Sequence, residues 1–100
     1  MKISAIYCLD YPDGHPKNPL IARGEIRVEV GEGKPTIEAF DSTYSFTVYT
    51  IEFLQQELQV GRKYVIDRAT IIVERFDQAV IREAIESILD KLDCFGVKVG

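Results

Sequence analysis

The sequence contains few of the residues that build metal, redox and membrane sites. Its 100 residues include one His, two Cys and no Trp. A single imidazole, that of His15, cannot form a zinc site alone. Cys8 and Cys94 have no second Cys at metal-ligand spacing, so we predict free thiols and no metal or other cofactor. No apolar run approaches the ~18 residues of a membrane-spanning helix, so we predict no membrane span.

The chain also has few basic residues. It carries 12 Lys and Arg against 16 Asp and Glu, a formal net charge of −4. Phosphate neutralisation needs clustered Lys and Arg, so we predict no nucleic-acid ligand, whereas a basic protein partner is compatible with this charge. The length predicts one domain over residues 1–100. Asp10 interrupts the first apolar stretch before a signal-peptide core is complete, so we expect a cytoplasmic protein.

The most informative stretch is residues 69–92. Its apolar, β-branched beginning, residues 70–73, predicts a central strand buried on both faces. Asp77 is then a good N-cap, and Phe76 and Ile81 have the spacing of a hydrophobic staple. Apolar residues recur at intervals of three and four, which predicts one long helix packed on the sheet; they are Ile81, Ala84, Ile85, Ile88 and Leu92.

The rest of the chain predicts the other strands and a short helix. The strand segments are residues 2–9, 25–30, 36–40, 43–49 and a short terminal run, 97–99. In the first of them, Ile3, Ala5, Tyr7 and Leu9 are expected on one side. Thr50 caps a short helix over residues 51–59, which Gly61 ends. We predict an α+β fold, a mostly antiparallel four- or five-stranded sheet with one long and one short helix packed on one face.

A catalytic site has little support. His15 lies in a proline-rich loop near Asp10 and Asp13, so a metal site or an acid–base pair can be imagined. However, Asp and Gly there are turn formers, and no Ser or Cys beside His15 is an evident nucleophile. Gly31 and Gly33 belong to no phosphate-binding pattern. We predict no enzyme, with no catalytic, cofactor-binding or metal-binding residues.

The long helix predicted after Asp77 offers one candidate binding surface, formed by Glu83, Glu86, Asp90 and Asp93. Spacings of three, four and three place these carboxylates on one helix face. Glu86 and Asp90 repel each other at i,i+4, and Asp90 and Asp93 oppose the dipole at the helix end by roughly 0.3–1 kcal/mol each. The strip is either an ordinary solvated face or a docking surface for a basic partner.

The polar face of the sheet is the second candidate binding surface. Tyr49, Glu29 and Arg27 are the residues that we single out there, in a row that also includes Glu25, Glu38 and Thr47. Tyrosine is a common interface anchor, because it offers a rigid contact area with a polar tip. Exposed tyrosines on sheets are also ordinary strand formers.

Two segments carry a family resemblance: SFTVYTIEFLQQEL (45–58) and TIIVERFDQAVIREAIESIL (70–89). In the first, a strand enters a short helix through a Thr. In the second, an apolar strand ends in Val-Glu-Arg-aromatic-Asp, and a helix begins directly from that Asp. These features resemble the immunity protein 8 family of bacterial polymorphic toxin systems. The chain differs from the family at residues 51–53, where members often have Pro and Trp.

The resemblance implies a small cytoplasmic inhibitor that binds and neutralises a cognate toxin domain encoded beside it. The family does not specify one toxin class, and a basic nuclease is one option. No family motif falls on the predicted partner-binding residues. The alternative is a small self-associating structural or ligand-binding subunit, and a homodimer remains open.

Overall fold

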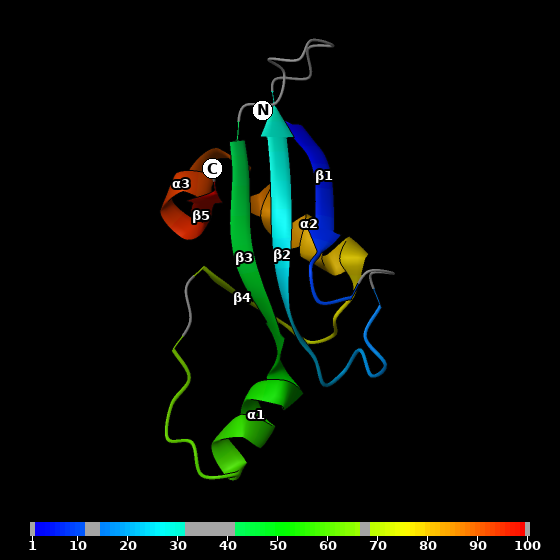
Figure 1. Ribbon diagram of the computed structural model, residues 1–100, viewed down its shortest axis with the longest axis vertical. Coiled ribbons are helices and arrows are strands. Elements are labelled where there is room, and N and C mark those ends of the chain that lie inside the picture. The colour runs from blue at the N-terminus through cyan, green and yellow to red at the C-terminus, as the bar shows by residue number, and fades with distance from the viewer. Residues whose placement is uncertain (1, 12–14, 32–41, 67–68, 100) are drawn as a thin grey trace.

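The computed structural model describes residues 2–11, 15–31, 42–66 and 69–99 and shows an α+β fold (Figure 1). A single sheet contains strands β1 (Lys2–Cys8), β2 (Arg23–Gly31), β3 (Ser42–Thr50), β4 (Thr70–Val73) and β5 (Val97–Val99). The helical segments are α1 (Ile51–Gln59), α2 (Gln78–Ser87), the 3₁₀ turn η2 (Leu89–Lys91) and α3 (Leu92–Phe95). The predicted fold class and the mostly antiparallel five-stranded sheet are confirmed.

The core lies between the sheet and α2, which crosses behind the strands in Figure 1. Alternate residues of β2 and β3 point to this side, because successive side chains in a strand point to opposite faces. Ile81 and Ile85 of α2 pack on them and are at most 2% exposed. The strand residues of this core are Ile26, Val28, Val30, Tyr44, Phe46 and Val48.

Both predicted helix caps are confirmed. The Asp77 carboxylate accepts a 2.8 Å hydrogen bond from the backbone N–H of Ala79, and α2 begins at the next residue after the cap. Phe76 and Ile81, the predicted staple, are both buried in the core. Thr50 caps α1 by accepting from the N–H of Phe53 at 3.3 Å.

The central strand is β3, so the prediction for residues 70–73 is wrong. β3 pairs with β2 along one edge, and β4 and β5 share its other edge. β4 is a four-residue strand whose only described neighbour is β3, in the parallel direction. Val73 faces the core, but Ile72 is 59% exposed. The β-branched composition of β4 therefore reflects strand propensity and the burial of one face only.

The predicted long helix is interrupted at Ile88. Ser87 Oγ donates a 2.6 Å hydrogen bond to the carbonyl of Ala84, and Ile88 N–H bonds to Ile85 in the tighter i→i−3 pattern. A serine side chain that competes for backbone acceptors weakens a helix at that point. The interruption places Asp90 and Asp93 in the first turns of new segments. It thereby removes the dipole penalty that a continuous helix would impose on both carboxylates.

The short helix α1 is not packed on the face of the sheet. The prediction that the long and the short helix share one face is therefore wrong. Helix α1 continues from the end of β3 and projects beyond the sheet (Figure 1), and none of its residues is buried. The molecule is consequently elongated, with extents of 49 × 26 × 22 Å. Its radius of gyration is 14.4 Å, against about 13 Å for a typical domain of this length.

The side chains of β1 do not alternate as the sequence predicts. An irregularity between Ile3 and Ala5 shifts the alternation, so that Ile3, Ile6 and Cys8 pack on the core. Ala5 and Tyr7 share the opposite face, because they pair with Glu29 and Arg27. The predicted strand over residues 36–40 lies outside the described residues. No helix within the described ranges is long and apolar enough to cross a membrane.

Candidate functional site

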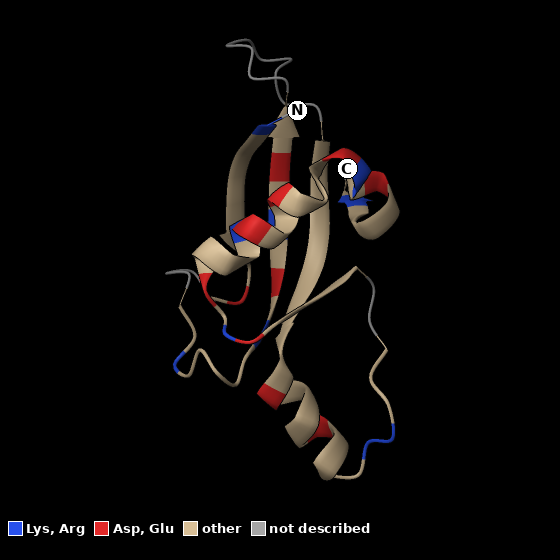
Figure 2. Ribbon diagram, turned by 180° about the vertical axis from the view of Figure 1, so that it is seen from behind, with Lys and Arg blue, Asp and Glu red and all other residues tan. Residues whose placement is uncertain are grey.

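Three carboxylates surround an open hollow where the C-terminal helical segments meet the sheet. Its volume is about 370 Å³, and it is lined by Tyr44, Glu86, Leu89, Asp90, Leu92 and Asp93. We refer to these six residues as the acidic hollow. One carboxylate comes from each of α2, η2 and α3, and Figure 2 shows both acidic and basic segments along this part of the chain. Among the described residues that line the hollow are two leucines and no Lys or Arg.

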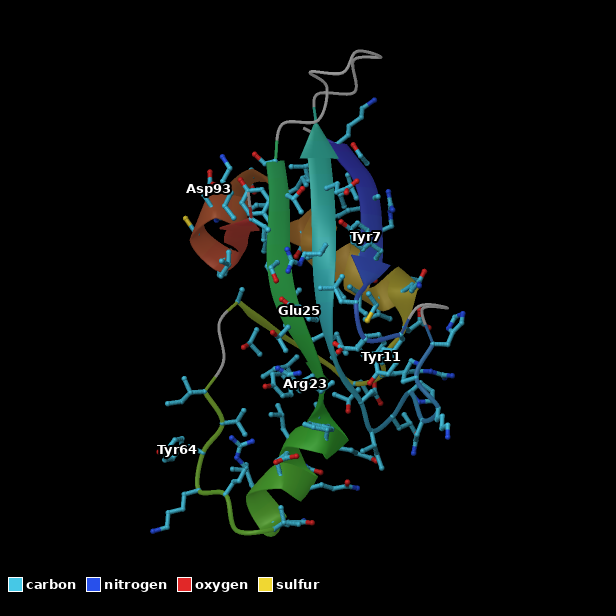
Figure 3. The ribbon with its side chains drawn as sticks, viewed as in Figure 1. Tyr7, Tyr11, Arg23, Glu25, Tyr64 and Asp93 are labelled. Carbon is cyan, nitrogen blue, oxygen red and sulfur yellow. The ribbon has the colours of Figure 1, made fainter. Side chains whose placement is uncertain are left out.

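Tyr44 connects the acidic hollow to the central strand. Its side chain is only 3% exposed, and its hydroxyl donates a 2.6 Å hydrogen bond to Asp93 Oδ1. Figure 3 shows Asp93 beside the upper half of β3. Because the Asp93 carboxylate accepts this bond, and because the ring is buried, the pKa of Tyr44 is raised above 10.0. At neutral pH the phenol is therefore a neutral donor that holds Asp93 in place.

The predicted acidic strip is only partly reproduced. Glu86, Asp90 and Asp93 line the acidic hollow, whereas Glu83 does not. Glu86 Oε1 lies 3.3 Å from Arg82 Nε in an exposed i,i+4 pair, a type of contact that contributes only about 0.3–0.5 kcal/mol. Asp90 is exposed, and no ion pair in the described part of the chain includes it. Asp90 is thus the lining carboxylate most available to a partner.

Tyr49 is not the exposed anchor that the sequence predicts. It lies on the expected face of β3 but is only 4% exposed. Phe53, in the first turn of α1, packs against its ring with centroids 5.8 Å apart. The guanidinium of Arg23 lies 5.5 Å from the ring centroid, and Arg23 Nε donates to the Tyr49 hydroxyl at 3.2 Å. The start of α1 and Arg23 therefore cover Tyr49.

Arg27 and Glu29 lie on the open face of the sheet, where the alternation predicts them. Both are half-buried. Tyr7 donates a 3.2 Å hydrogen bond to Glu29 Oε1, and Arg27 Nη2 lies 3.6 Å from Glu25 Oε1; Figure 3 labels Tyr7 and Glu25 on this face. Tyr44, on the other side of β3, lines the acidic hollow. The structure therefore separates the two predicted surfaces onto opposite sides of the sheet. Glu38 lies outside the described residues.

His15 lines a separate hollow of about 270 Å³ together with Arg75, Asp77 and the first residue of α2. Asp77 already caps α2 with one carboxylate oxygen. Asp10, the expected partner of His15, accepts a 2.6 Å hydrogen bond from the N–H of Glu25 through one carboxylate oxygen. Asp10 is not among the residues that line this hollow, and Asp13 lies outside the described residues.

The sequence reasoning missed Tyr44 and the two leucines of the acidic hollow. Tyr44 was expected to point inward, and a buried tyrosine hydroxyl usually finds a hydrogen-bond partner. That rule predicts a polar neighbour without identifying Asp93. Leu89 and Leu92 carry a weaker signal, because leucine beside a helix end is common in any core.

The described residues include no group of three or more His, Cys, Asp or Glu side chains arranged to hold a metal ion. The three carboxylates of the acidic hollow thus face a shared space without converging on one point. No protein-family model matches the chain, and no significant similarity to a curated protein or to a solved structure was found.

Proposed function

We propose that this protein binds and neutralises a cognate toxin domain, as an immunity protein, by accepting a basic side chain of the toxin in the acidic hollow. The observation that carries the proposal is the lining, whose described residues include three carboxylates and two leucines but no Lys or Arg. Such a site complements an Arg or Lys, whose apolar stem can lie on leucine while its charged head contacts carboxylates.

The fixed position of Asp93 adds to this complementarity. Its bond to Tyr44 holds one carboxylate before a partner arrives, and a preorganised group loses less conformational entropy on binding. Asp90 has no competing ion pair within the described ranges. Arg82 holds Glu86 only through an exposed pair, which a better placed cation can replace at little cost.

Charge and family resemblance support a toxin as the basic partner. A net charge of −4 attracts a basic domain over a distance of the order of the Debye length, about 10 Å at 0.1 M salt. The segments 45–58 and 70–89 resemble the immunity protein 8 family, whose members neutralise toxins encoded beside them. Both proteins would meet in the cytoplasm of the producing cell.

The proposed mechanism is occlusion and includes no catalysis by this chain. His15 lies in a different hollow, which contains none of the three carboxylates of the acidic hollow. We therefore expect His15→Ala to leave toxin binding and neutralisation unchanged. Loss of neutralisation by this variant with unchanged binding would contradict the occlusion mechanism.

The experiment is co-purification with the product of the open reading frame immediately upstream, followed by affinity measurements at increasing salt. We expect a complex with a dissociation constant of the order of nanomolar that weakens as salt is added, because rim charges are screened. Absence of a complex with that product would contradict the proposal. A tight complex that is insensitive to salt would contradict the role of the carboxylates.

A further inference from the structure

A second surface lies at the opposite end of the molecule from the acidic hollow. We call residues 51–66, which comprise α1 and the loop after it, the arm. None of the residues of α1 is buried. The arm exposes five large apolar side chains, from 44% for Leu58 to 83% for Ile66; they are Ile51, Leu58, Val60, Tyr64 and Ile66. Figure 3 shows Tyr64 on the loop, on the side away from the sheet.

This exposure is unusual for so short a helix. Isolated helices of fewer than about 12–15 residues are marginal in water, and most helices in proteins are stabilised by burying an apolar face. α1 has nine residues, and its anchors to the sheet, the Thr50 cap and the ring contact between Phe53 and Tyr49, are both at its first turn. Clustered apolar side chains on such a segment mark an interaction surface.

The charges of the arm indicate what covers it. Its charged residues are Glu52, Glu57, Arg62 and Lys63, so the arm is neutral in a chain of net charge −4. A strongly basic or acidic partner therefore gains no attraction from this surface. Arg62 and Glu57 already pair within the arm at 3.3 Å. The described part of the chain supplies no ion pair for Glu52 or Lys63.

Glu52 and Lys63 lie at opposite ends of the arm. Glu52 is in the first turn of α1, whereas Lys63 follows its last turn, and Figure 2 shows acidic segments on the helix and basic segments on the loop. When two identical arms lie antiparallel about a two-fold axis, opposite ends meet. Lys63 of each copy then faces Glu52 of the other, as a self-complementary interface requires.

We infer that the arm binds the arm of a second copy of this chain in a two-fold symmetric dimer. The apolar side chains of the two arms cover one another, and two Lys63–Glu52 pairs set the antiparallel orientation. The segment α3, which contributes Leu92 and Asp93 to the acidic hollow, lies at the other end of the sheet (Figure 1), so both copies keep the hollow accessible. The dimer does not depend on the toxin-binding role.

Sedimentation velocity of the full chain over a range of concentrations tests this inference. We expect a dimer whose mass is twice that of the chain at the higher concentrations. Tyr64→Lys combined with Ile66→Lys should raise its dissociation constant about tenfold or more, because these side chains are 69% and 83% exposed in the monomer and would be covered in the dimer. Val80→Lys is the matched control: Val80 is 41% exposed but lies on α2, and the variant should remain dimeric.

A charge exchange tests the orientation. Glu52→Lys alone and Lys63→Glu alone should each weaken the dimer, and the double variant should restore it, because the pairs then reverse their sign. A wild-type chain that is monomeric at every concentration would overturn the inference, as would equal weakening by the arm variant and Val80→Lys. Protection of the arm from hydrogen exchange on addition of the upstream gene product, in a monomeric chain, would also overturn it and would assign the arm to that partner.

Discussion

The hydroxyl of Tyr44 donates a 2.6 Å hydrogen bond to Asp93, which ties the central strand to the last helical segment. β5 then follows directly and pairs with the same half of β3 that contains Tyr44. The contact thus serves two purposes. It fastens the C-terminal segment to the sheet, and it positions one carboxylate of the acidic hollow.

Tyr44→Phe should lower the free energy of unfolding by about 1 kcal/mol, because it removes one hydrogen bond to a charged group at a partly accessible site. Chemical denaturation is the measurement. Tyr7→Phe is the matched control, since Tyr7 is 42% exposed and its bond to Glu29 is longer, at 3.2 Å; its loss should be smaller. Equal losses in the two variants would contradict a special role for Tyr44.

Alkaline pH should weaken the same contact. The pKa of Tyr44 is raised in the folded state, first by its hydrogen bond to the Asp93 carboxylate and then by burial. A raised folded-state pKa means that the stabilisation is complete below the ordinary value of 10.0 and is lost as pH rises through the folded-state pKa. Unfolding measured as a function of pH should show this decline, with a shallower slope in Tyr44→Phe. An unchanged slope would show that Tyr44 does not contribute to it.

Thr50 should be more sensitive to substitution than Asp77, although both cap helices. Thr50 is fully buried, and its hydroxyl oxygen accepts from Ala22 N–H at 3.0 Å as well as from Phe53 N–H. Thr50→Val leaves a buried donor unpaired and α1 uncapped, so we expect a loss of about 2–3 kcal/mol. Asp77→Ala removes one exposed cap bond and should cost about 1 kcal/mol. The reverse order in a denaturation experiment would contradict the double role of Thr50.

A side chain at Gly96 should destabilise the protein. A Cβ atom there would lie 2.8 Å from Phe46 Cζ and 3.1 Å from the carbonyl oxygen of Leu92. Phe46 is 1% exposed and packed in the core, so Gly96→Ala should cost about 1–3 kcal/mol through overpacking. The cost should shrink in a Phe46→Leu background, where the ring tip is absent. Additive effects of the two substitutions would exclude this clash as the cause.

The features that the sequence predicts well depend on neighbours in the chain. Asp77 and Thr50 cap helices because a polar side chain precedes an amphipathic run, and alternation in residues 43–49 gives the correct inward face. The helix interruption could have been suspected, since Glu86, Asp90 and Asp93 already made a continuous helix unfavourable.

The features that the sequence predicts poorly depend on contacts between separate elements. β4 has a typical core-strand composition, yet β3 is the strand that gains neighbours on both edges. Tyr49 has the outward register of an exposed residue, but Phe53 and Arg23 cover it. Glu86, Asp90 and Asp93 are predicted to share a face of one helix but come from three short segments, and Tyr44 joins Asp93 from a strand far away in the sequence.

The most direct measurement compares the affinity of Asp90→Lys and Glu83→Lys for the product of the upstream open reading frame. Both variants make the same charge change in the same C-terminal region, and both side chains are exposed, but only Asp90 lines the acidic hollow. We predict that Asp90→Lys weakens binding at least about tenfold, since it places like charges together, while Glu83→Lys changes it little. Equal affinities of the two variants would contradict the acidic hollow as the binding site.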